Sequence, residues 1–536
     1  MLQSLEMALR QKQHAILAGI TCVLMIAGLL GCNLPTGQMA PATATAFSAR
    51  QTLSANLFPT STIDALATPS SPDFTPEVPG DPDPTKTPLG AIIDPSQDVP
   101  AGVLHYVSQS GDTLAVVASH FGVSANEITL DLSIATNNLL PVDTVLMVPD
   151  VIEGDIPYPE PVLPDSEVVY GPGADSFDLI AYVNQAGGYL TRYTERLDDK
   201  VYTGPEIVHM VAVETSTNPR LLLAFLDFRS NWVFGNPTGA ESNVYPIGFR
   251  TTNDKGLYKE LMIAARMLAE GYYGWRYATL SNMAILDTGS IVISPTLNAG
   301  SVAVQKLFAS LYYEKYWVTE LYGPDGFLVF YEDIFGDPWV RAADLEPLLN
   351  ANVQQPDLAL PFLPGLRWAF TAGPHAAWQT GTPRAAVDFA PVTGEPACAV
   401  SNTWTTAAAP GLVVRSSRGT LALDLDGDGD EGTGWVLVYM HVAEKERAEV
   451  GSSLDLDGLI GHPSCERGNA TGTHLHFTRK YNGEWIATDG PLPMILDGWQ
   501  AFAGERRYEG TLVRAYQTVT ANVNGMTGSS IYRDDD

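Results

Sequence analysis

The 536-residue sequence has few cations and few cysteines, and both shortages limit the kind of protein it encodes. Lysine and arginine total 30 against 61 acidic residues, a formal charge of −31, and neither cation occurs between Lys86 and Arg192. Nucleic acid and anionic lipid surfaces are bound by clustered cations, so neither is expected as the main partner. Four cysteines are too few for a disulfide-built scaffold. Because 45% of the residues are hydrophobic, the chain can still bury real cores.

Long apolar runs are absent after Leu30. Arg10 and Lys12 precede the one such run, from Ala15 to Leu30, which is short for a membrane-spanning helix of about 20 residues but suits the core of a signal peptide. The run ends Leu29-Leu30-Gly31-Cys32, which resembles the lipoprotein box of bacterial secreted proteins and implies a lipid on Cys32. A plain secretory signal or an uncleaved anchor is the alternative. We expect residues 1–32 to be a lipoprotein signal peptide, and the rest to lie outside the cytoplasm, lipid-anchored to a bacterial membrane.

Two stretches are predicted to be linkers. Residues 33–103 are rich in Pro, Thr, Ala and Ser, and twelve of the 38 prolines fall within 33–100. Such a composition buries too little apolar surface to fold and keeps the chain extended. Four further prolines mark residues 151–168 as a second, shorter linker.

Residues 104–150, between the linkers, are predicted to fold as strand, helix, helix, strand. Asp112 or Thr113 can cap a helix that ends at Gly122, and Ser124 with Glu127 forms a capping box for the next. Short apolar strands are expected at 105–107 and 145–148.

This segment resembles the LysM module through Tyr106, Gly111-Asp112-Thr113-Leu114, Gly122-Val123-Ser124, Ile128, Asn137 and Val148-Pro149. That family binds the N-acetylglucosamine of peptidoglycan or chitin, which implies glycan contacts at Gly111, Asp112 and Thr113. Most of the matching residues are core or turn positions, so a module that only spaces or packs is the alternative.

Residues 169–355 are predicted to form a mainly helical domain of unknown function. Asn218-Pro219 is typical of a helix start, followed by a helix over 220–231. Further helices are expected over 256–270, ending at Gly271, and from Asn298 to about Tyr313. The many Tyr and Trp residues indicate either core packing or a sugar-stacking groove. The segment faintly resembles lysozyme-like glucosaminidases, but Arg229 stands where the catalytic Glu would be; Glu214 and Asp227 are the nearby carboxylates, and no spacing demonstrates a catalytic pair.

The residues best suited to catalysis lie near the C-terminus, where five of the nine histidines fall between His375 and His476. Asp388 follows His375 by thirteen residues. WVLVYMHV alternates as a strand, which would place His441 on one face with Trp435, Leu437 and Tyr439. His474 and His476 are two apart, so on a strand both point the same way. Two His nitrogens and one carboxylate are a usual ligand set for catalytic zinc.

These motifs resemble the lysostaphin-like zinc endopeptidases that cut peptidoglycan peptides, and most closely the staphylolysin branch. The resemblance covers about residues 365–500. It implies one zinc ion held by His375, Asp388 and His476, with His441 and His474 beside the metal-bound water and the oxyanion, in an antiparallel β-sheet groove. Which of the two acts as base is not readable. The alternative is a catalytically inactive peptidoglycan-binding or amidase-regulating lipoprotein. His462 is interpreted as an incidental turn residue.

Two features near these motifs leave alternatives open. Cys398 and Cys465 are expected to pair as a disulfide in an oxidising compartment, with two buried thiols as the alternative. Asp424, Asp426 and Asp428 mimic the first half of a calcium loop, but position twelve falls on Trp435, which excludes an EF-hand. A solvated hairpin turn is favoured there over a weak cation site.

Together these expectations describe a multidomain protein. It has a small βααβ LysM-like module (104–150), a mainly α-helical middle domain (169–355), a mainly antiparallel β metallopeptidase domain (356–520) and a polar tail (521–536). We expect its partners to be the peptide and glycan of peptidoglycan and, through its lipid, a membrane, with no nucleic acid.

Overall fold

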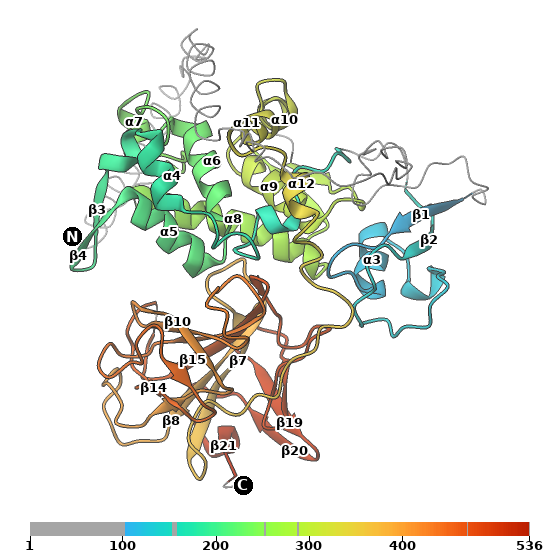
Figure 1. The fold of residues 1–536 in the computed structure, drawn as a ribbon. Helices are drawn as coiled ribbons and strands as arrows, with labels where there is room; N and C mark the ends of the chain where they lie inside the picture. Colours follow the sequence, from blue (N-terminus) through green and yellow to red (C-terminus); the bar gives the residue numbers. More distant parts are fainter. Residues whose placement is uncertain (1–101, 153–157, 251–252, 287–288, 469, 535–536) are drawn as a thin grey trace, which may run out of the picture. The chain divides into compact units, whose positions relative to one another are not determined.

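The computed structural model describes residues 102–152, 158–250, 253–286, 289–468 and 470–534, drawn in colour in Figure 1. The expected signal peptide, Cys32 and nearly all of the first linker lie outside these residues. Among the helices that are described, none combines the length and the apolar character needed to cross a membrane.

The 102–152 segment has two antiparallel strands and one α-helix. The strands β1 (Val103–Val107) and β2 (Val145–Pro149) pair along their whole length, and the helix α3 (Leu114–Phe121) is capped by the Thr113 side chain. The expected second helix is only the 3-10 turn η1 (Ala125–Glu127), although its capping box is present. The helix stops there because Thr129 forms an antiparallel bridge with Met147 of β2, which requires extended backbone.

The middle region is helical, as expected, with two added β-hairpins, β3–β4 and β5–β6. Its elements are η2 (Asp165–Glu167), α4 (Leu179–Ala186), η3 (Tyr189–Arg192), β3 (Thr194–Leu197), β4 (Lys200–Thr203), α5 (Gly204–Thr215), α6 (Pro219–Ser230), α7 (Ala240–Val244), α8 (Leu257–Arg276), β5 (Asn282–Ile285), β6 (Gly289–Val292), α9 (Ala299–Ala309), α10 (Glu314–Tyr322), α11 (Phe327–Phe335) and α12 (Pro338–Ala342).

Two predicted helix ends are wrong. Helix α8 continues through Gly271 to Arg276, because this glycine allows α9 to approach: a Cβ there would lie 2.7 Å from the Cα of Ala303. Helix α9 ends at Ala309, short of the expected Tyr313, and α10 begins after a turn. The predicted start at Asn218 is confirmed, since its side chain accepts from the amide of Arg220.

The second linker is shorter than predicted, because its last residues belong to the helical core. Val162 and Leu163 are fully buried. The Asp165 carboxylate accepts hydrogen bonds from the amide of Gly300 and the side chain of Asn298, at the start of α9. The buried Asp165 carboxylate that anchors this segment has no signature in composition, which is why the prolines alone predicted a longer linker.

The C-terminal region is built on antiparallel strands, drawn in orange and red in Figure 1. The main sheet has the order β13-β10-β11-β12-β15-β8-β7-β21, with β16 paired to β15. Its strands are β7 (Arg367–Ala376), β8 (Arg384–Pro391), β10 (Gly411–Ser417), β11 (Thr420–Asp424), β12 (Trp435–Met440), β13 (Ser453–Leu454), β15 (Leu475–Tyr481), β16 (Glu484–Trp485) and β21 (Ser530–Tyr532). Two smaller sheets comprise β9 (Thr405–Thr406) with β14 (Leu459–Gly461), and β17 (Ile495–Leu496), β18 (Trp499–Ala503), β19 (Gly510–Arg514) and β20 (Gln517–Thr520).

The segment predicted to be a polar tail contributes the edge strand β21. Ile531 pairs with Trp368 of β7 and is buried. A strand of three residues with one apolar side chain is too short to stand out from a polar sequence, which is why composition missed it.

The two faces of the main sheet belong to different cores. Val436 and Val438 of β12 join the hydrophobic cluster of the helical region, whereas Leu437 and Tyr439 face a second cluster made by the C-terminal strands. This alternation is what a strand buried on both faces requires. One face of the sheet therefore packs against helices, and the metal-ligand candidates lie on its neighbouring strands β7, β8 and β15.

Candidate metal centre

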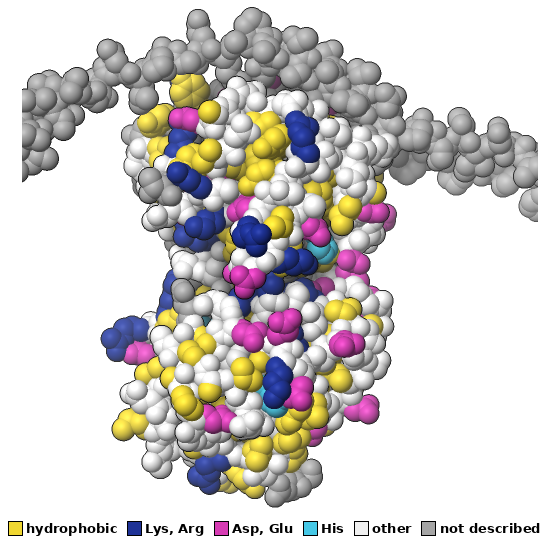
Figure 2. Space-filling model, turned by 90° about the vertical axis from the view of Figure 1, so that its left-hand side faces the viewer, with side chains coloured by type: hydrophobic (Ala, Val, Ile, Leu, Met, Phe, Trp, Pro, Cys, Tyr) yellow, Lys and Arg dark blue, Asp and Glu magenta, His cyan; other side chains and the backbone are white. Residues whose placement is uncertain are grey.

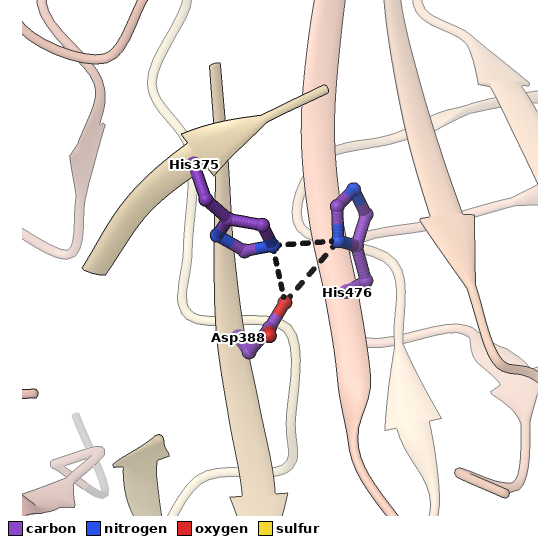
Figure 3. Close-up of side chains that lie close together, drawn as sticks. All are labelled: His375, Asp388 and His476. Carbon is purple, nitrogen blue, oxygen red and sulfur yellow. Dashed lines mark hydrogen bonds and ion pairs between the residues drawn. The ribbon is translucent and has the colours of Figure 1, made fainter. Parts of the chain in front are cut away.

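Three neighbouring strands bring the predicted ligand set together. His375 lies on β7, Asp388 on β8 and His476 on β15. Asp388 is directly opposite His476 in the β8–β15 pair, and the irregular register of β7 shifts His375 to face the same point. The three side chains converge in Figure 3, although 101 residues separate the two histidines.

The converging atoms are close enough to share one ion. The Nε2 of His375 lies 3.3 Å from Asp388 Oδ1, and the Nδ1 of His476 lies 3.2 Å from the same oxygen. The two nitrogens are 3.1 Å apart. All three residues are buried, and they are a potential metal-binding group among the described residues.

Backbone carbonyls fix which nitrogen of each ring faces the centre. The Nδ1 of His375 is 2.9 Å from the carbonyl of Gly373, and the Nε2 of His476 is 2.8 Å from that of Ala377. If the ring proton of each histidine is on the nitrogen that faces the carbonyl, that nitrogen donates a hydrogen bond, and the other nitrogen presents a lone pair to the centre. Two lone pairs and a carboxylate oxygen then meet at about 3 Å, and Asp388 Oδ1 is buried without a hydrogen-bond donor. Atoms arranged in this way can hold a cation between them.

The charges of these groups shift their pKa values in opposite directions. Burial favours the neutral form of Asp388, but His375 and His476 outweigh it and hold the pKa of the carboxyl well below its usual value. Burial also lowers the pKa of His476. For His375 burial is again the largest influence, yet the nearby Asp388 carboxylate and the carbonyl of Gly373 together raise its pKa. The carboxylate is thus ionised, as a metal ligand must be.

The two other predicted histidines lie beside this centre. The Nε2 of His474 is 3.7 Å from Asp388 Oδ2, and the rings of His441 and His474 are 4.4 Å apart between centroids. Each bonds a carbonyl through Nδ1: His474 that of Gly472, and His441 that of Glu466. Burial, followed by the nearby charges of His474 and His476, lowers the pKa of His441 to about 4, so His441 is neutral at neutral pH.

One part of the prediction for His441 is wrong. It does not continue the strand face of Leu437 and Tyr439: β12 ends at Met440, and His441 has a left-handed backbone, with φ of 61°. The alternating pattern could not show that the chain turns at this residue. The turn, not the strand, brings the ring to His474.

The carbonyls that orient the rings are the functional groups that sequence reasoning missed. Main-chain carbonyls cannot be identified from residue types, but one sequence spacing does indicate two of them. Both Gly373-Pro374-His375 and Gly472-Thr473-His474 are Gly-x-His, and in each the histidine Nδ1 meets the carbonyl two residues before it. Tyr508 was also missed; its ring lies 4.7 Å from that of His375.

The remaining candidates of this region lie apart from the three ligands. Cys398 and Cys465 form a disulfide. The Asp424–Asp428 segment begins the turn between β11 and β12, and Asp424 accepts from the amides of Asp426 and Gly429. The carboxylates of Asp424, Asp426 and Asp428 lie close enough together to hold an ion, so both alternatives for this segment stay open. His462 meets Glu446 and the carbonyl of Thr403, away from the three ligands.

The residues expected to contact glycan are largely occupied within the chain. Asp112 is buried and accepts from the Tyr106 hydroxyl and the Gln109 amide, both at 2.8 Å. Gly111 lies against the guanidinium of Arg276. Gly111 and Thr113 also line a cavity of about 270 Å³ together with Arg276.

The polar groups considered for a glucosaminidase site are engaged in contacts. The Glu214 carboxylate is held by Arg467 and Tyr258, and Asp227 accepts from two backbone amides. Arg229 donates to the carbonyl of Ile247. These contacts indicate stabilising roles for all three.

Comparison with known proteins gives similarities in the same regions. Residues 161–349 match the family model described as LasA, N-terminal domain. Protease LasA of Pseudomonas aeruginosa is 26% identical over 367 residues, which cover 63% of this chain and 78% of the relative. The same protease from a second strain is also 26% identical, over 365 residues.

Two solved structures resemble part of the fold. The M23 metalloprotease pseudoalterin is 19% identical and aligns over 31% of this chain and 96% of its own, with a TM-score of 0.26. The catalytic domain of the antimicrobial peptidase lysostaphin from Staphylococcus simulans is 20% identical and aligns over 23% and 87%, with a TM-score of 0.16. This chain is therefore similar to protease LasA over most of that protein's length.

Proposed function

We propose that this protein is a zinc endopeptidase that hydrolyses peptide bonds of peptidoglycan. The observation that carries the proposal is the convergence of His375 Nε2, His476 Nδ1 and the buried, donor-free Asp388 Oδ1 within about 3 Å of one another. The similarity to protease LasA supports peptide-bond cleavage. The LysM-like module and the lysostaphin-like motifs support peptidoglycan as the substrate.

The three ligand candidates fit zinc by donor type, number and outer contacts. Two imidazole nitrogens and one carboxylate are the usual set for a catalytic site with one position left open. The carbonyls of Gly373 and Ala377 each contact the ring nitrogen that faces away from the centre and so orient the rings, as hydrogen-bond acceptors behind the ligands do in zinc sites. When bound there, zinc would lower the pKa of a coordinated water towards about 7 and polarise the scissile carbonyl.

In this proposal His441 and His474 handle the protons. Each ring is held through Nδ1 by a carbonyl, so Nε2 is free to accept or donate a proton at the reacting centre. His441 has a pKa lowered to about 4 and is therefore an unprotonated acceptor at neutral pH. One of the pair takes the proton of the attacking water, and the pair stabilises the oxyanion and protonates the leaving amine.

The remaining parts would bring this site to the cell wall. In this proposal the N-terminal lipid on Cys32 holds the protein outside the cytoplasm on a bacterial membrane, and the 104–150 module binds glycan as LysM modules do. Contacts made by Gly111 and Thr113 would start from the cavity that they share with Arg276. Holding glycan near the peptidase raises the local concentration of cross-linking peptides.

Metal analysis of the purified ectodomain tests the metal assignment. We expect one zinc per chain after purification at neutral pH, and loss of that zinc in His375→Ala. His462→Ala is the matched control, since His462 lies in the same sheet region but bonds Glu446 and Thr403. A wild-type protein without zinc refutes the assignment.

Digestion of insoluble peptidoglycan tests the activity. We expect new amine ends and shortened cross-bridge peptides, read by mass spectrometry, with wild type and His462→Ala but not with His375→Ala. Identical products from wild type and His375→Ala would show that the cleavage does not come from this site. Binding to peptidoglycan without new amine ends would favour a non-enzymatic wall protein.

A further inference from the structure

A buried carboxylate of the helical region holds two arginines of the sheet region. Glu214, near the end of α5, is 4% exposed. Its Oε2 accepts from Arg467 and, at 3.1 Å, from the Tyr258 hydroxyl, and its Oε1 lies 3.4 Å from Arg418 Nε. Arg467 also donates to Tyr258 at 2.7 Å. The face drawn in Figure 2 shows basic and acidic side chains intermixed at the surface.

The segment that carries Arg467 also holds His441. The carbonyl of Glu466, the residue before Arg467, lies 3.0 Å from His441 Nδ1. Two residues further back, Ser464 donates through its amide (2.7 Å) and its hydroxyl (2.9 Å) to the His441 carbonyl. Segment 464–467 is therefore the support of the His441 ring and backbone.

The backbone at these points is unusual for residues other than glycine. Arg467 has φ of 62°, Arg418 of 49° and His441 of 61°. Left-handed backbone at a residue with a Cβ is unfavourable and persists where surrounding contacts enforce it. For Arg467 the enforcing contact is the ion pair with Glu214, because this pair ties the side chain to α5.

We propose that Glu214 is a positioning residue for His441. Glu214 fixes Arg467, Arg467 fixes the backbone of Glu466, and the Glu466 carbonyl holds the His441 ring in the tautomer and direction needed for proton transfer. The helical region thus completes the catalytic centre that the sheet region carries. This inference rests on the proposed peptidase function, and it assigns Glu214 no contact with substrate or metal.

The test compares Glu214→Gln and Arg467→Met with a matched variant, Glu167→Gln. Glu167 is also a buried carboxylate held by an arginine and a tyrosine, Arg341 and Tyr331, but all three lie in the helical region. Its loss should weaken that region without reaching segment 464–467. Full-length proteins are compared by hydrogen–deuterium exchange without added metal, and by kcat and KM on a defined peptidoglycan peptide.

We expect Glu214→Gln and Arg467→Met each to speed amide exchange in 464–467 and to lower kcat about tenfold, the size typical of lost supporting contacts. KM should stay within about twofold, and the double variant should match the single ones because both break one chain of contacts. Glu167→Gln should leave both readouts at wild-type values.

Unchanged exchange in 464–467 in both site variants would overturn the inference, as would equal effects from Glu167→Gln or a change confined to KM. If Glu214→Gln does not fold, Arg467→Met alone decides by the same two readouts. An inactive wild type would refute the proposed function instead, and the exchange measurement would still show whether Glu214 orders this segment.

Discussion

Replacing Arg276 with methionine should destabilise the protein strongly, because this one guanidinium joins three segments of the chain. Its Nη2 lies 2.7 Å from Asp165 Oδ2 and 3.0 Å from Glu484 Oε1, and its Nε lies 3.1 Å from Glu484 Oε2. A further donor, Nη1, bonds the carbonyl of Ser110. Exposed fractions of 6%, 3% and 1% for the arginine, aspartate and glutamate side chains leave little room for water.

The size of the effect follows from the two carboxylates left behind. Removing one partner of a buried ion pair costs about 3–5 kcal/mol, because the remaining charge stays buried and unpaired. That is a rise of roughly two to nearly four powers of ten in the unfolding equilibrium constant. Neutralising one carboxylate as well, in Arg276→Met with Glu484→Gln, should recover part of the loss.

Denaturant unfolding of wild type, Arg276→Met and the double variant measures these differences. Arg506→Met is the control, since its ion pair with Glu509 lies on the surface and its loss should not be measurable. Hydrogen–deuterium exchange should also rise in residues 108–112, which lose the bond to Ser110. An Arg276→Met protein within about 1 kcal/mol of wild type would refute the reasoning.

Three further predictions concern stability. The pKa of His120 is lowered to about 4, mainly by burial, whereas an unfolded histidine titrates near 6.5. Below about pH 6.5 the unfolded chain therefore binds a proton that the folded chain does not, and the free energy of unfolding falls on the order of 3 kcal/mol as the pH drops towards 4. His120→Phe should reduce this dependence of stability on pH, measured by denaturant unfolding at a series of pH values. Gly271→Ala should destabilise by about 1–3 kcal/mol despite better helix propensity, because its Cβ meets the Ala303 backbone; a higher melting temperature would contradict this. Replacing Cys398 and Cys465 by serine should cost about 4 kcal/mol on the chain-entropy model, and an unchanged unfolding midpoint would count against it.

The three candidate ligands were named from the family resemblance and not from spacing alone. The structure brings their side chains together, because strand pairing places Asp388 opposite His476 and β7 lies next to β8. The spacing of His474 and His476 predicted a shared strand face, but β15 begins at Leu475, after His474.

Interactions between distant segments could not be predicted in the same way. From the sequence Glu214 is only a carboxylate in a region predicted to be helical, and only the fold shows that it forms an ion pair with Arg467. From the sequence Gly271 predicts a helix end, and only the close approach of α9 explains why a glycine lies inside α8. The turn at His441 could not be predicted from the sequence either. The strand alternation continues up to this residue, where the backbone becomes left-handed.

The pairing of β21 with β7 has a consequence for folding and self-association. β7 carries His375, and the outer side of its first three residues, 367–369, is covered by residues 530–532, which follow every other strand of the sheet in the sequence. Until these last residues pair, that part of β7 offers free amides and carbonyls to any extended peptide. A shortened chain lacking β21 should therefore aggregate edge to edge.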